Sequence, residues 1–114
     1  MLNSYSQEFK IAATSLLLNI VQKIDSKKKK QYYKIFQKKL NIEPEEFDSI
    51  KESINIDTIT INEKIDIIRK ELGFKQFAIM SFLMMLNQCI ILDGCDIESY
   101  GRFESIRDSF MEQL

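Results

Sequence analysis

The 114-residue sequence contains no histidine and no tryptophan, and it has only two cysteines. Without histidine, no imidazole is available for acid–base catalysis, for activating a serine or cysteine nucleophile, or for metal binding. Cys89 and Cys95 alone cannot supply the four ligands of a structural zinc site. The sequence also lacks a Gly-rich phosphate-binding loop and a nucleophile elbow. We therefore expect a non-enzymatic protein without a cofactor.

The two cysteines lie six residues apart across a predicted helix end, and no secretory signal precedes them. Disulfides are uncommon in reducing compartments. Reduced thiols in a cytoplasmic protein are thus the first expectation, and a Cys89–Cys95 disulfide is the alternative. Cys95 lies near a predicted helix N-terminus, which favours a thiolate, but the neighbouring Asp93 and Asp96 would oppose one.

Glycine and proline are scarce, with three and one residues. Because these residues separate the strands of β-rich folds, their scarcity favours helices. Apolar residues make up 45% of the chain, a content typical of a packed globule and not of a disordered chain. The length suits one domain. We predict a single all-α domain over residues 1–114, a compact bundle of five to seven helices.

Apolar residues recur at helical spacing along most of the chain, and helix-boundary residues divide the pattern into segments. Asp25–Ser26 has N-cap chemistry, and Pro44 suits the first turn of a helix. Asn41 and Gly73 suit helix ends, and Asn62 is expected to cap the helix before Gly73. The predicted helices cover residues 6–24, 27–40, 44–54, 63–72, 74–92 and 97–110.

The segment NIDTITIN, residues 55–62, alternates isoleucine with polar residues as a β-strand does. A single strand has no sheet to join. We therefore predict a loop that is anchored to the core by Ile56, Ile59 and Ile61.

The run Phe77–Leu92 contains no charged residue. At a rise of ~1.5 Å per residue it is about 24 Å long as a helix, shorter than the ~30 Å hydrocarbon core of a membrane. A helix that is apolar on all sides is normally buried. We therefore predict no transmembrane segment, and a central position in the bundle for the helix over residues 74–92. Its methionines, Met80, Met84 and Met85, are expected to fill the core.

Charge is unevenly distributed along the chain, whose net charge is −1. Residues 1–40 carry nine lysines and two acids, a net charge of +7, and residues 41–114 carry −8. Lysines at helical spacing could bind nucleic acid, an anionic membrane surface or an acidic protein. A solvated helix face facing the acidic half of the chain is the alternative. The candidate anion- or partner-binding residues are Lys23, Lys27, Lys28, Lys30, Lys34 and Lys38.

The stretch ILDGCD ends the apolar run in an acidic turn. Asp93–Gly94 suits a helix stop, and Asp96 suits the N-cap of the last helix. A calcium-binding loop does not fit, because Arg107 takes the place of its final glutamate when counting starts at Asp96. Three carboxylates without a neutralising lysine nearby could instead form a weak site for a divalent cation or a partner. The residues of this weak site are Asp93, Asp96 and Glu98.

The two halves of the chain resemble each other. Residues 13–25 align without a gap on residues 81–93, so that Leu16 falls on Met84 and Asp25 on Asp93. The Leu-Asn pair at 18–19 also falls on the same pair at 86–87. Both copies then lead into an amphipathic helix. A pseudo-two-fold arrangement of helical hairpins follows from this pattern.

The second copy resembles the TerB-like helical domain, which is associated with bacterial tellurite resistance and stress systems. The resemblance is carried by a long apolar helix that runs into Asp-Gly, an acidic turn and an amphipathic helix. The family usually has a glutamate about seven positions after the aspartate, where this chain has Tyr100. The resemblance implies an all-helical fold and a role in stress response. Its residues here are Leu86, Asn87, Leu92, Asp93, Gly94, Asp96, Glu98 and Ile106.

Three classes of function are open at this point. The leading hypothesis is a non-enzymatic interaction or regulatory module, similar to TerB-like stress-response domains, that acts on a protein partner through its charged surfaces. The second is a binder of nucleic acid or of an anionic membrane surface through the basic helix Lys27–Lys39. The third is a small inhibitor or immunity-type protein, which no residue in particular supports.

Overall fold

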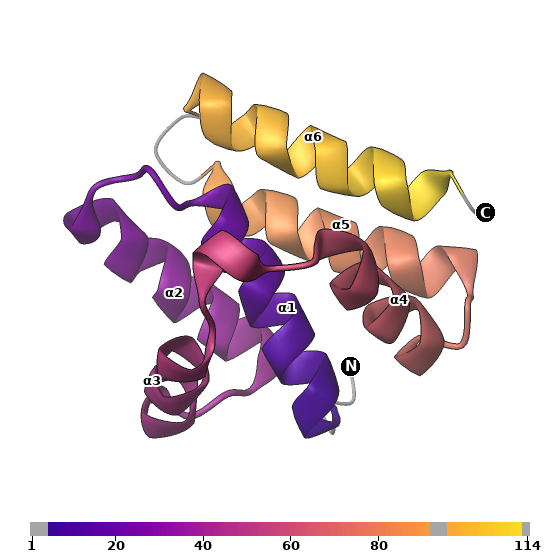
Figure 1. The fold of residues 1–114 in the computed structure, drawn as a ribbon, viewed down its shortest axis with the longest axis horizontal. Coiled ribbons are helices and arrows are strands. Elements are labelled where there is room, and N and C mark those ends of the chain that lie inside the picture. Colours follow the sequence, from indigo (N-terminus) through magenta and orange to yellow (C-terminus); the bar gives the residue numbers. More distant parts are fainter. Residues whose placement is uncertain (1–4, 92–95, 113–114) are drawn as a thin grey trace.

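The computed structural model describes residues 5–91 and 96–112, and within these ranges the chain is helical and contains no strand. The described residues form six α-helices, within the predicted range of five to seven (Figure 1). In the same two ranges, no helix is both long and apolar enough to cross a membrane. The helices are α1 (Gln7–Ile20), α2 (Ser26–Leu40), α3 (Pro44–Ser53), α4 (Ile61–Glu71), α5 (Gln76–Ile90) and α6 (Ile97–Met111).

Most of the predicted helix boundaries are confirmed by their cap geometry. A carboxylate oxygen of Asp25 accepts a hydrogen bond from the backbone N–H of Lys28 at 3.1 Å and so caps α2. Asn41 ends α2 in the left-handed conformation, with φ of 55°. Pro44 occupies the first turn of α3. Gly73 follows α4 with φ of +69°, a conformation that glycine adopts without steric cost.

The segment between α3 and α4 is a loop, as predicted, with one short 3₁₀ turn at Ile56–Thr58. The side-chain oxygen of Asn55 accepts from the N–H of Asp57 at 3.1 Å and starts this turn. The predicted cap at Asn62 is wrong. Helix α4 begins one residue earlier, at Ile61, and the preceding Thr60 makes no side-chain cap hydrogen bond.

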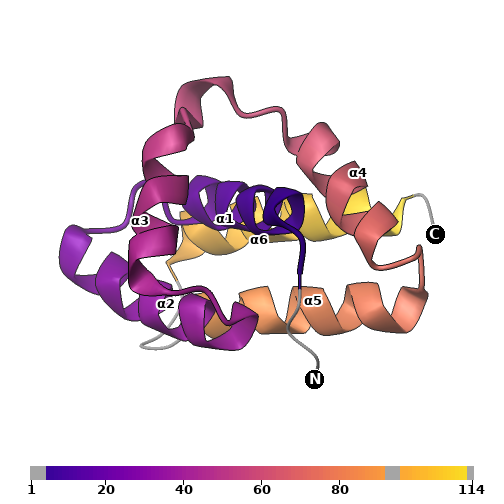
Figure 2. The same cartoon turned by 90° about the horizontal axis from the view of Figure 1, so that it is seen from below.

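The central helix of the bundle is α1, and the prediction that the helix over residues 74–92 is central is wrong. Six consecutive residues of α1, Ala12–Leu17, are fully buried, so that α1 is covered on all sides. Figure 2 shows it between α2 and α5 on one side and α3 and α4 on the other. Three of the six, Ala12, Ala13 and Ser15, are small, which lets neighbouring helices approach closely. The hydroxyl of Ser15 donates to the carbonyl of Ile11 at 2.8 Å, so its burial leaves no unmet donor.

Helix α5, in contrast, lies at the surface. Its inner side packs into the core through residues such as Ile79 and Leu86, whereas Phe77, Met80 and Met84 are exposed. The prediction that the methionines fill the core is therefore wrong for Met80 and Met84. An apolar residue pattern shows that a side chain gains from burial, but it does not show whether this chain or another molecule provides the cover.

Two helix pairings agree with the predicted internal repeat. Helix α1 packs against α6, and α2 packs against α5. The first helix of each predicted hairpin thus contacts the second helix of the other, as a pseudo-two-fold arrangement requires. The two copies differ in burial, since Leu16 is fully buried and the aligned Met84 is exposed. The repeat itself stays a prediction.

A buried arginine connects α4 to the end of α6. The guanidinium of Arg69 donates to the backbone carbonyl of Ser109 at 2.7 Å and to that of Phe110 at 3.4 Å. It also forms an ion pair with Asp66 at 2.8 Å and lies over the ring of Phe110. The last carbonyls of a helix have no partner within it and carry partial negative charge. Arg69 supplies both the hydrogen bonds and the positive charge that these carbonyls need.

Candidate functional site

The outward face of α5 is uncharged and mostly apolar, which is unusual for an exposed helix face. We define the α5 crest as Phe77, Met80, Met84, Gln88 and Ile91, all of which are exposed. Phe77 is 85% exposed and Met84 60%. Their spacing of three or four residues places them in one row along the helix. Rows of exposed apolar side chains on this scale commonly mark interaction sites.

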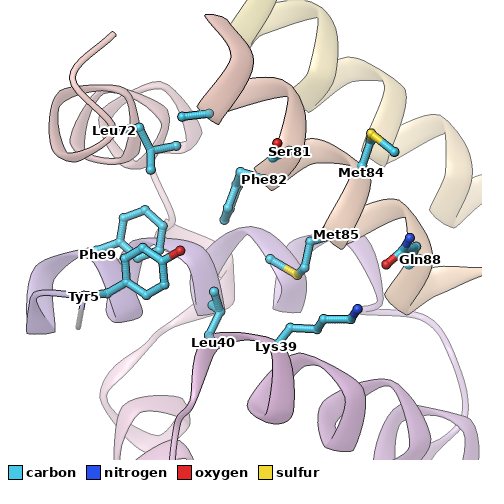
Figure 3. Close-up of a pocket in the computed structure, with 11 residues that line it drawn as sticks. Tyr5, Phe9, Lys39, Leu40, Leu72, Ser81, Phe82, Met84, Met85 and Gln88 are labelled. Carbon is cyan, nitrogen blue, oxygen red and sulfur yellow. The ribbon is translucent and has the colours of Figure 1, made fainter. Parts of the chain in front are cut away.

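A pocket of about 270 Å³ lies on one side of the crest, where α5 meets the start of α1 and the end of α2 (Figure 3). The rings of Tyr5 and Phe9 stack at 4.3 Å and form one wall, and Phe82 closes the inner end. Figure 3 shows Lys39 reaching from the end of α2 towards Gln88, beneath Met85. The lining residues are Tyr5, Phe9, Lys39, Leu40, Leu72, Ala78, Ser81, Phe82, Met84, Met85 and Gln88.

A second pocket, of about 200 Å³, lies on the other side of the crest, between α5 and α6. Among the described residues that line this pocket, only Arg107 is charged. Its guanidinium forms ion pairs with Glu104 at 3.6 Å and with Asp108 at 3.3 Å. The described residues that line the two pockets thus include two cations, Lys39 and Arg107, and no acid. The residues of the second pocket are Met80, Leu83, Met84, Asn87, Tyr100, Phe103, Arg107 and Met111.

Two shifted pKa values describe the electrostatics beside the first pocket. Burial raises the pKa of the Cys89 thiol to about 12, and the nearby positive charge of Lys39 partly opposes this rise. Cys89 is a free, protonated thiol at neutral pH. Burial also raises the pKa of Tyr5, with a smaller contribution from the negative charge of Glu71. Neither group is therefore ionised at neutral pH, and Lys39 supplies the charge at this side of the crest.

All six predicted lysine candidates are exposed, and none forms an ion pair within residues 5–91 and 96–112. They do not share one surface with the crest. At 100° per residue, Lys27, Lys30, Lys34 and Lys38 point away from the buried side of α2. Lys23 precedes α2, and Lys28 lies close enough to Asp96 to lower its pKa. The exposure of these lysines is compatible with a solvated helix face and with a binding face. Binding of an anion or a partner by these lysines therefore stays a prediction.

The acidic turn is described only in part, because Asp93 lies outside the described residues. Asp96 caps α6: its carboxylate accepts from the backbone N–H of Ser99 and from the Ser99 hydroxyl, both at 3.0 Å. These hydrogen bonds, and then the charges of Arg102 and Lys28, lower the pKa of Asp96. The expectation that no lysine lies near these carboxylates is therefore wrong. Glu98 is exposed in the first turn of α6.

The chain contains no cluster of three or more potential metal-binding side chains within residues 5–91 and 96–112. Since Asp93 is not among these residues, the three-carboxylate site itself stays a prediction. The described part favours the cap instead, because Asp96 already accepts two hydrogen bonds and has two cations nearby.

Replacement of Asp96 by alanine is expected to lower the melting temperature of the protein by a few degrees at neutral pH, because it removes the cap of α6. A carboxylate whose pKa is lowered on folding stabilises the fold above its unfolded pKa, which is near the ordinary aspartate value of 3.8. This contribution is lost as the pH falls through the lower, folded-state pKa. The difference in melting temperature from wild type should therefore disappear in strong acid, as thermal unfolding at several pH values will measure. Glu98→Ala, in the same turn, is the control and should change the melting temperature less. An Asp96→Ala difference that persists in acid would contradict the capping role.

The α5 crest and its two pockets were not predicted from the sequence. The spacing of Phe77, Met80 and Met84 was visible, but it is equally compatible with burial of a helix that is apolar on all sides. The small residues of α1 were the available signal. They favour α1 for the crowded central position, which leaves one side of the bulkier α5 uncovered.

The chain matches no protein-family model, and comparisons with curated proteins and with solved structures gave no match either.

Proposed function

We propose that this chain is a non-enzymatic protein-interaction module that binds a protein partner through the α5 crest. The observation that carries the proposal is a 15-residue helix without a single charge that leaves Phe77, Met80 and Met84 exposed to solvent, with a pocket on each side of Met84. Exposure of large apolar side chains is unfavourable unless another molecule covers them. A crest with a groove on each side is the form of surface that receives a helix or an extended segment.

The methionines support the same proposal. Met80 and Met84 are unbranched and have three rotatable bonds and a polarisable sulfur, so they adapt to the shape of a partner. Met84 lines both pockets. Movement of this one side chain therefore changes the shape of both grooves at once.

This proposal retains the interaction role that the TerB-like resemblance implies, but it moves the binding surface from the charged faces to the apolar crest. The competing hypothesis is binding of nucleic acid or an anionic membrane through α2. It is supported by the exposed, outward-facing lysines, which lie away from the crest. No separate surface supports a role as an inhibitor or immunity-type protein, and such a role would be a special case of binding a protein partner.

Photo-crosslinking in the cells that produce the protein will separate the two hypotheses. A photoreactive residue placed at Met84 should give a crosslinked protein product, and the same residue at Lys34, on the outer face of α2, should give little. Both side chains are exposed, so neither substitution disturbs the core. Crosslinks to nucleic acid or lipid at position 34, together with no product at position 84, would contradict the proposal and favour the basic helix.

A further inference from the structure

We infer that the partner segment is an acidic amphipathic helix, which lies along the α5 crest with its apolar side in the grooves and its carboxylates against the bordering cations. This inference rests on the proposed function and specifies the chemistry of the partner. It is carried by the uncharged crest and the charges at its borders.

The dimensions of the crest suit a helix. From Phe77 to Ile91 it extends for about 21 Å at ~1.5 Å per residue, close to four helical turns. A partner helix of similar length presents apolar side chains at every third or fourth position. Such side chains can enter the pocket of about 270 Å³ between α5 and α2.

The charged residues that line the two pockets or cap α5 are all cations in the described part of the chain. Helix α5 contributes no charge, and its N-cap residue, Lys75, is exposed at the end of the helix where Phe77 lies. Lys39 lines the pocket on the α2 side and Arg107 the pocket on the α6 side. Within residues 5–91 and 96–112, neither Lys39 nor Lys75 forms an ion pair. A partner with carboxylates beside its apolar stripe would pair with these lysines, and a basic partner would be repelled.

A second copy of the chain offers a poorer match. A symmetric dimer places the same surface on both sides of the contact. The described residues that line the crest and pockets include cations and no acid, so the lining residues of one copy would offer no carboxylate to Lys39 or Lys75 of the other. An anionic membrane would match the charge, but a flat lipid surface does not use two concave grooves on either side of a ridge.

The inference will be tested with two synthetic helical peptides of equal length. Both carry leucine along one face at the spacing of the crest, and their other face is glutamate in one peptide and lysine in the other. The glutamate peptide should bind the full chain at least about tenfold more tightly at low salt, as measured by calorimetric titration. The preference should shrink as salt screens the charges.

Matched variants locate the contact. The double variant Lys39→Glu/Lys75→Glu should remove the preference for the glutamate peptide. Lys30→Glu/Lys34→Glu makes the same change in net charge on the outer face of α2 and should leave the preference in place. Phe77→Ser/Met84→Ser should weaken binding of both peptides about tenfold. Ile97→Ser is its control, because Ile97 is 87% exposed and lines neither pocket.

The outcomes distinguish the inference from the function on which it rests. Equal binding of the two peptides, lost in Phe77→Ser/Met84→Ser, would overturn the acidic partner and keep the crest as a binding surface. Binding of neither peptide would overturn both. Sedimentation of a wild-type dimer that Met84→Ser dissociates would identify a second copy as the occupant and overturn the inference. Binding to phosphatidylserine vesicles that Phe77→Ser abolishes would overturn it in favour of a membrane.

Discussion

Leu16→Ala is expected to lower the free energy of unfolding by about 3–5 kcal/mol, and Met84→Ala by less than about 1 kcal/mol. The two residues occupy equivalent positions in the internal alignment, but Leu16 is 0% exposed at the centre of the bundle and Met84 is 60% exposed. Truncation of Leu16 removes a buried side chain and leaves a cavity among helices that pack against α1 from several sides. Truncation of Met84 removes little buried surface. Urea unfolding monitored by circular dichroism measures both changes.

This pair of variants also tests the arrangement of the bundle. Both substitutions end in alanine, which favours helices, so intrinsic helix propensity contributes little to the difference between them. If Met84→Ala destabilised the protein as much as Leu16→Ala, α5 would be covered in solution. That result would contradict both its surface position and the proposed binding surface.

Arg69→Met is expected to cost about 2–4 kcal/mol of stability. Methionine retains most of the packing of the arginine stem, so the loss measures the guanidinium. Without that group the carbonyls of Ser109 and Phe110, at the end of α6, lose a charged donor in a place where water has little access. The exposed Asp66 remains solvated and adds little to the cost. Denaturant unfolding of the variant gives the loss of free energy.

Lys70→Met is the control for Arg69→Met, because it removes the neighbouring positive charge of α4 at an exposed position. It should change stability by less than about 0.5 kcal/mol. Similar effects of the two variants would mean that the charge of α4 as a whole, and not the buried contact with α6, is what stabilises the protein.

Local chemistry in the sequence was sufficient to predict most of the helix boundaries. Asp25, Asn41, Pro44, Gly73 and Asp96 each act within one or two turns of the chain, so the residue type alone shows what the backbone does there. The cap at Asn62 was misplaced by such reasoning because the helix begins one residue before it, at Ile61, without a side-chain cap.

Which helix lies at the centre was not predictable from periodicity. Both α1 and α5 are apolar around most of their circumference, and each gains from burial. Packing determines which of the two helices is central. Other helices pack around Ala12–Leu17 on every side, whereas Phe77, Met80 and Met84 of α5 remain exposed. The candidate site follows from this outcome, so it was missed for the same reason. The exposure of the lysines was predictable, since charged side chains are seldom buried.

The pairing of α1 with α6 also bears on how the protein is made. The guanidinium of Arg102 donates to the carbonyl of Ile20 at 2.9 Å across 82 residues of sequence, and α6 covers part of α1, the central helix of the bundle. Contacts between distant segments form late, because the entropy of closing a long loop must first be overcome. During translation α1 leaves the ribosome before α6 and remains partly uncovered until α6 has been synthesised. Until α6 has been synthesised, the nascent chain therefore exposes apolar residues of α1 that the folded protein buries, and chaperones that hold unfolded chains can bind them during this period.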